Sequence, residues 1–179
     1  MNTADGLNAI FEEMRGVFAR MPPDAPTRLA GEISKARRVL VYGVGRTGLA
    51  LQAFAMRLMH LGIDGHFVGQ LSAPPVGSGD LLFAVLSVGR LPTGDAIVQS
   101  AKAAGARVAV ITARPDLVAA DLVIPLPAQT MADPMTSILP LGSPFELALS
   151  LFCDLTVVEL MRLLGRSNAD LAARHTNLL

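Results

Sequence analysis

Glycine, arginine and hydroxyl side chains gather in a turn, Gly43-Val-Gly-Arg-Thr-Gly48, directly after the apolar run at residues 38–42. Its glycines allow the backbone to turn tightly. A helix that starts in this turn would present free N–H groups and its positive dipole end to an anion. Arg46 and Thr47 add a charged donor and a hydroxyl donor. The pattern therefore predicts a binding site for an anionic group, because a turn that binds nothing would need neither side chain.

The same spacing, G-x-G-x-x-G, also occurs in dinucleotide-binding folds. Those folds need an acidic residue about 20 residues further on, at the end of the second strand. Here Asp64 precedes the candidate second strand, and Gly69 and Gln70 end it. The context favours a phosphate site over a dinucleotide site, and we expect no cofactor.

A second turn, from Ser87 to Gly94, follows another strongly apolar run and contains Ser87, Arg90 and Thr93. Two such turns at the ends of neighbouring parallel strands can hold one ligand between them. An ordinary loop rich in glycine and proline would give the same pattern, so this alternative stays open.

Glu146 and His175 are candidates for acid–base chemistry. In isolation, Ser143-Pro-Phe-Glu146 has the pattern of a helix capping box, with a general base near a strand-end cleft as the second interpretation. His175 suits proton transfer near neutral pH, although a histidine near a chain end is commonly just solvated. The histidines lack the spacing of metal ligands, so we expect no metal.

Apolar runs alternate with helical patterns along the chain, which is typical of βα units in a parallel sheet covered on both faces. Residues 127–141 show no period and predict a mobile or substrate-covering loop. We expect strands at residues 38–42, 66–68, 81–87, 107–113 and 122–126, and helices at 5–21, 27–36, 49–61, 95–104, 117–120, 144–164 and 168–174.

Composition excludes several classes of function. The 15 basic and 15 acidic residues balance, so we expect no nucleic-acid partner and no anionic membrane surface. The apolar stretch 147–164 contains charged residues and indicates a core or interface helix, not a membrane span. The sequence has one cysteine, Cys153, and a polar start with no sign of a signal peptide, which together favour a cytoplasmic location.

Taken together, four stretches resemble the sugar isomerase (SIS) domain family, and within it the 6-phospho-3-hexuloisomerase branch. They are Val41-Tyr-Gly-Val-Gly-Arg-Thr-Gly48, Ala53-Phe-Ala-Met-Arg-Leu-Met-His-Leu-Gly62, Leu139-Pro-Leu-Gly-Ser-Pro-Phe-Glu146 and Asp170-Leu-Ala-Ala-Arg-His175. The resemblance covers nearly the whole chain. The second and fourth stretches are specific to that branch, whereas the glycine turn alone is not.

The resemblance implies an α/β fold: a three-layer α-β-α sandwich with a five-stranded parallel sheet, doubly wound like flavodoxin. It implies one domain over residues 1–179, made of N-terminal helices (1–37), core βα units (38–126), a loop (127–142) and C-terminal helices (143–179). It also implies a homodimer or homotetramer with active sites near the subunit contacts. The apolar helix at 145–163, or the N-terminal helix, would form such a contact.

The family's functional residues carry over by motif. Gly45, Arg46 and Thr47 would line a sugar-phosphate site, Glu146 would be the catalytic base, and His175 would be a second acid–base or ring-opening group. The implied reaction interconverts 3-hexulose 6-phosphate and fructose 6-phosphate through an enediolate. An isomerase of another phosphorylated sugar, or a non-catalytic sugar-phosphate-binding module, are the alternatives.

One turn departs from the family pattern. The family's S-x-S-G-E-T phosphate turn is replaced here by Ser87-Val-Gly-Arg-Leu-Pro-Thr93. Hydroxyl donors are lost, and a cation, Arg90, is gained. A guanidinium can bind phosphate with two parallel hydrogen bonds, so Arg90 is the candidate replacement. Otherwise the substrate differs or phosphate binding at this turn is weak.

Overall fold

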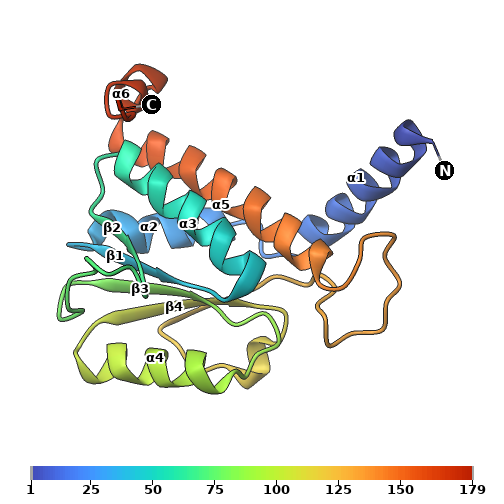
Figure 1. Ribbon diagram of the computed structural model, residues 1–179, viewed down its shortest axis with the longest axis horizontal. Coiled ribbons are helices and arrows are strands. Elements are labelled where there is room, and N and C mark those ends of the chain that lie inside the picture. The colour runs from blue at the N-terminus through green and yellow to red at the C-terminus, as the bar shows by residue number, and fades with distance from the viewer. Residues whose placement is uncertain (1, 179) are drawn as a thin grey trace.

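The computed structural model describes residues 2–178, which form an α/β fold with one parallel sheet of five strands (Figure 1). The strand order is β2-β1-β3-β4-β5, so the chain reverses its winding direction between β1 and β3. The strands are β1 (Val39–Tyr42), β2 (Gly65–Phe67), β3 (Leu81–Val85), β4 (Arg107–Thr112) and β5 (Leu122–Pro125). The helices are α1 (Thr3–Ala19), α2 (Ala25–Lys35), α3 (Gly45–His60), α4 (Pro92–Ala103), α5 (Ser143–Leu164) and α6 (Asn168–Ala172), with a 3₁₀ turn, η1, at Pro115–Leu117.

Side chains of the central strands alternate between two apolar cores, as the two-residue period of a strand requires. On β1, Val39 and Val41 point into the larger core, which α1, α2, α3 and α5 cover. Leu40 and Tyr42 point to the opposite face, which α4 covers. Figure 1 shows this unequal arrangement, with α4 alone below the sheet and the other long helices above it. The predicted three-layer architecture is confirmed.

Helices α1 to α5 all start earlier than the sequence-based expectation, and the differences at α3 and α5 affect the candidate site. α3 begins at Gly45, not near residue 49, so the glycine turn forms the first turn of the helix. α5 begins at Ser143, with Gly142 as its N-cap, because the Gly142 carbonyl accepts the N–H of Glu146. Glu146 is therefore one position too deep for a capping box, and the capping-box interpretation is wrong.

The predicted short helix at residues 117–120 is also wrong. The chain forms the 3₁₀ turn η1 instead and is extended at Val118. β5 begins at Leu122, so the chain must become extended soon after Leu117, which leaves no room for a longer helix. Within residues 2–178, no helix combines the length and the apolar character that a membrane crossing needs.

Candidate active site

A pocket of about 240 Å³ lies beyond the carboxyl ends of β1 and β3, where the winding direction of the sheet reverses. Ligands of doubly wound sheets bind at this position. Four segments build it: the turn after β1 with the start of α3, the turn after β3, the loop before α5, and the first turn of α5. Its lining residues are Val44, Gly45, Arg46, Thr47, Ser87, Thr130, Met131, Leu141, Gly142, Phe145 and Glu146.

The glycine turn brings the start of α3 close to the end of β1. A Cβ atom on Gly48 would lie 2.7 Å from the carbonyl oxygen of Gly43, so only glycine fits there. Gly45 has a φ of +56°, in the left-handed region that glycine adopts without strain. Among residues 2–178, no side chain caps the N-terminus of α3, which leaves its first N–H groups available to a ligand.

Thr47 lines the pocket, but its hydroxyl donates to the carbonyl of Val44 at 2.7 Å. This hydrogen bond closes the glycine turn within the protein. The hydroxyl oxygen can still accept a hydrogen bond from a ligand.

Arg46 and Glu146 form the charged centre of the pocket. Nε of Arg46 donates to Oε2 of Glu146 in a close ion pair that joins the start of α3 to the start of α5. The Arg46 side chain is 71% exposed, whereas that of Glu146 is 20% exposed. The carboxylate, free of any capping role, is held inside the pocket and faces an exposed cation.

The second turn is only partly in the pocket. Ser87 lines it, and the Ser87 carbonyl accepts the N–H of Ala113. Arg90 and Thr93 are exposed and are not among the described lining residues. The Arg90 guanidinium donates instead to Asp95, in the first turn of α4, at 2.8 Å. Asp95 therefore already pairs with Arg90, the cation that the sequence analysis identified as a candidate phosphate ligand.

His175 lies at the other end of α3 from Glu146. Its ring stacks on His60, the last residue of that helix, with centroids 5.2 Å apart and planes 20° from parallel. α3 has 16 residues and is therefore about 24 Å long. Within one protomer, the structure does not bring His175 to the pocket that holds Glu146.

Comparisons with known proteins were made by sequence and by structure. The chain is 33% identical over 186 residues to a 3-hexulose-6-phosphate isomerase of Bacillus subtilis, covering 99% of this chain and 100% of that protein. The chain belongs to the SIS-domain family of phosphosugar isomerases. It is also 35% identical to a 3-hexulose-6-phosphate isomerase of Methanocaldococcus jannaschii, with 84% of this chain and 82% of that one covered.

A solved SIS-domain structure agrees. The crystal structure of a Methanococcus jannaschii protein, from which a 3-hexulose-6-phosphate isomerase function was inferred, superposes with a TM-score of 0.84. The two chains are 30% identical, and the superposition covers 98% of this chain and 99% of that one. No family model matches the chain.

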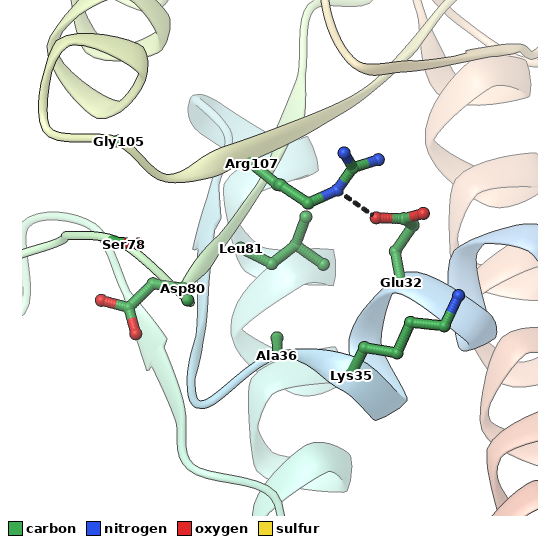
Figure 2. A pocket seen from close by; sticks show the side chains of 9 residues that line it. Glu32, Lys35, Ala36, Ser78, Asp80, Leu81, Gly105 and Arg107 are labelled. Atoms are coloured by element: carbon green, nitrogen blue, oxygen red, sulfur yellow. Dashed lines mark hydrogen bonds and ion pairs between the residues drawn. The ribbon is translucent and has the colours of Figure 1, made fainter.

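A larger pocket of this SIS domain, about 560 Å³, lies at the opposite, amino-terminal edge of the sheet. Most of its charged groups pair within the protein (Figure 2): Arg107 donates to Glu32 at 2.6 Å. The buried carboxylate of Asp80 accepts from Arg37 and from the N–H of Gly77. These contacts tie the start of β3 to the chain before β1, so the polar groups here have a structural use.

Cys153 is buried in α5, and burial, with a smaller contribution from Asp154, raises the pKa of its thiol far above the ordinary value. Such a thiol stays protonated at neutral pH, which makes it a poor nucleophile. Cys153 is therefore a small apolar residue of the core.

Sequence reasoning predicted a mobile or substrate-covering loop at residues 127–141 but named none of its pocket-lining residues. Thr130, Met131 and Leu141 line the pocket from this loop. Asp133 holds the loop in place by accepting the N–H and hydroxyl of Thr130 and the guanidinium of Arg114. The Thr130 N–H and then its hydroxyl, with Arg114, lower the pKa of Asp133 against the effect of burial. In the sequence, the only sign that this segment could line a site was that its apolar residues follow neither a helical nor a strand period.

Proposed function

We propose that this SIS-domain protein interconverts 3-hexulose 6-phosphate and fructose 6-phosphate, with Glu146 as the proton-transferring base. The observation that carries the proposal is the Glu146 carboxylate, largely shielded from solvent, in the pocket at the switch point of the sheet. The similarity to 3-hexulose-6-phosphate isomerases of Bacillus subtilis and Mycobacterium gastri, each 33% identical to this chain, supports the choice of substrate.

The proposed reaction moves a carbonyl from C3 to C2. Glu146 removes the proton from C2 of the 3-hexulose, and the bonding electrons form a C2–C3 double bond while negative charge develops on O3. The same carboxylate then returns the proton to C3, as the hydroxyl proton of O2 passes to O3 and O2 becomes the carbonyl. Neither oxidant nor cofactor is needed, because atoms and electrons balance within the sugar.

Negative charge on the enediolate needs donors at the site where it develops. The free N–H groups at the start of α3, around Gly45, Arg46 and Thr47, are suitable donors. Ser87 and the guanidinium of Arg46, which also line the pocket, are the candidate donors to the phosphate. Arg90 and Thr93 join that site in our proposal only if Arg90 leaves Asp95, which an anion of higher charge could bring about.

His175 takes part in the proposed reaction only if a second copy of the chain brings it to the pocket. Its position at the far end of α3 rules out a role in its own protomer's site without a large movement. The proposal therefore includes a homodimer or homotetramer in which the C-terminal segment of one copy reaches the pocket of another.

The test is a coupled assay of the purified protein with 3-hexulose 6-phosphate, in which fructose 6-phosphate is followed. We expect rapid turnover that depends on Glu146. Absence of turnover, together with thermal stabilisation by some other sugar phosphate, would overturn the choice of substrate. It would then favour another phosphosugar isomerase or a non-catalytic sugar-phosphate-binding module.

A further inference from the structure

Glu146, the candidate base, forms an ion pair with Arg46, a cation that lines the same pocket. Among the described residues that line the pocket, Arg46 and Glu146 are the charged ones, and they pair with each other. Each lies in the first turn of a helix whose N-terminus faces the pocket. An anionic ligand group would therefore meet positive helix ends and one guanidinium that a carboxylate already holds.

The two partners differ in their freedom to move. Glu146 is 20% exposed and belongs to α5, where its N–H bonds the carbonyl of Gly142. Arg46 is 71% exposed and has a long, flexible stem, so its guanidinium can turn toward a ligand at little cost. If the pair separates, Arg46 is the partner that moves.

Pairing of this kind conflicts with base catalysis. The carboxylate oxygen that accepts the Arg46 N–H is not free to take a proton from a sugar carbon. A phosphate dianion, with three acceptor oxygens and a higher charge, is a better partner for the guanidinium than a carboxylate is. Binding of a phosphorylated ligand and activation of Glu146 can thus be one event.

We propose that Arg46 is a latch on Glu146: a dianionic group of the substrate takes the guanidinium over and releases the carboxylate to act as the base. The proposal rests on the proposed role of Glu146. It gives Arg46 a positioning role and narrows the substrate class to sugars with a dianionic group. Compared with sugars that lack the dianionic group, those sugars should have a higher kcat as well as a lower KM, because part of the binding free energy is used to release the base.

The first test uses fructose, which lacks the dianion, and supplies the dianion separately as phosphite. Deuterium uptake at C3 of fructose in D2O, followed by NMR, reports proton removal without the coupled assay. In the wild type, phosphite should raise the rate by roughly tenfold or more. In Arg46→Ala, the rate without phosphite should rise, since the carboxylate is unpaired, and phosphite should have no further effect.

A matched control is Arg162→Ala, which removes the α5 arginine that pairs with Glu159. It should respond to phosphite as the wild type does. No acceleration by phosphite in the wild type would overturn the latch. So would a lower rate without phosphite in Arg46→Ala, because an arginine that only supports the site would give that result.

The second test does not require turnover. Calorimetry gives the affinity for inorganic phosphate in the wild type, Glu146→Gln, Arg46→Ala and the double variant. A latch predicts that Glu146→Gln tightens phosphate binding by roughly tenfold, and that this gain disappears in the Arg46→Ala background. An equal gain in both backgrounds would indicate simple charge repulsion and would overturn the latch, as would absence of phosphate binding.

The two tests separate the failure of the latch from the failure of the proposed function. One outcome is that fructose 6-phosphate is not isomerised but the phosphate affinities of the four proteins show coupling between Arg46 and Glu146. The isomerase assignment then fails, and the competition between Glu146 and phosphate for Arg46 stands. If fructose 6-phosphate is isomerised and these affinities show no coupling, the latch fails alone.

Discussion

The imidazole rings of His60 and His175 stack face to face at the end of α3, with centroids 5.2 Å apart. His60 is buried, and Arg57 lies beside it, with an Nη1–Nδ1 distance of 3.4 Å. Burial above all, then the nearby His175 and Arg57, lowers the pKa of His60 from its ordinary value of 6.5. This contact between the C-terminal segment and α3 therefore favours a neutral His60 ring.

Stability should fall on acidification. Below about pH 6.5 the unfolded chain protonates His60 more readily than the folded chain does, so it binds more protons. The stabilisation from neutral His60 is fully present above that pH and is lost as the pH falls through the lower pKa of the folded state. Thermal unfolding at pH 7 and pH 5 should show a drop in Tm.

The matched variants are His60→Gln and His66→Gln. The drop in Tm between pH 7 and pH 5 should shrink in His60→Gln, which has no group to protonate at that position. His66, which pairs with Asp64 at 2.8 Å, serves as the control histidine. An unchanged drop in His60→Gln would show that other groups cause the acid sensitivity.

Gly48→Ala should damage the site and the fold together. Its Cβ would lie 2.7 Å from the carbonyl oxygen of Gly43, and backbone cannot move aside as a side chain can. Such crowding costs about 1–3 kcal/mol of unfolding free energy, and it would displace Arg46 two residues earlier. Denaturant unfolding and turnover should both report the loss.

Gly31→Ala is the control for that substitution. Gly31 lies inside α2, and a Cβ there meets nothing within 4 Å. Alanine should therefore stabilise the helix by about 0.5–1 kcal/mol and leave turnover unchanged. Equal effects of the two substitutions would contradict our account of the glycine turn.

Self-association should depend on the outer face of α5. Leu151, Leu155 and Val158 follow one another at helical spacing and are 40%, 46% and 59% exposed. α3, which packs against α5, also has exposed apolar residues, Leu49 and Met56. An apolar stripe of this kind is typical of a subunit contact. In sedimentation velocity at micromolar concentration, Val158→Glu should weaken association by roughly tenfold or more.

Gln99→Glu adds the same charge on α4, across the sheet, and should leave association unchanged. A wild-type chain that sediments as a monomer at micromolar concentration would contradict both the predicted oligomer and the proposed use of His175.

The large pocket at the amino-terminal edge should not take part in turnover. Lys35→Ala and Glu32→Gln change its charges, and the Glu32–Arg107 pair is largely open to solvent on the arginine side. Exposed pairs of this kind contribute about 1 kcal/mol or less to stability. We expect turnover within about twofold of the wild type, because the pocket is at the wrong edge of the sheet. A tenfold loss of turnover in either variant would contradict this account and indicate an active site at the amino-terminal edge.

Much of the fold could be predicted from the chain because β1, β3 and β4 are apolar runs that end in glycine or polar turns. β2 was harder: it has three residues, all only partly buried, since it lies at the edge of the sheet. The capping box at Ser143 was wrong because Gly142, not Ser143, accepts the first helical hydrogen bond. A one-residue shift of that kind lies below what a sequence pattern can resolve.

Part of the candidate site could be predicted as well. The glycine turn identified Gly45, Arg46 and Thr47, and the second turn identified Ser87, all of which line one pocket. The contact between Arg46 and Glu146 could not be predicted from the residues alone, because 100 positions separate the two and only the packing of α3 against α5 joins them. The pairing of Arg90 with Asp95 depends on the exact course of the turn before α4.

The most direct test of the proposed chemistry is deuterium uptake at C3 of fructose 6-phosphate in D2O, measured by NMR with the wild type, Glu146→Gln and Glu159→Gln. Glu159 lies on the same helix and pairs with Arg162, so it controls for loss of a carboxylate from α5. We predict rapid uptake in the wild type and in Glu159→Gln, and a loss of roughly 100-fold or more in folded Glu146→Gln. Near-normal uptake in Glu146→Gln would show that another group removes the proton and would contradict the central claim.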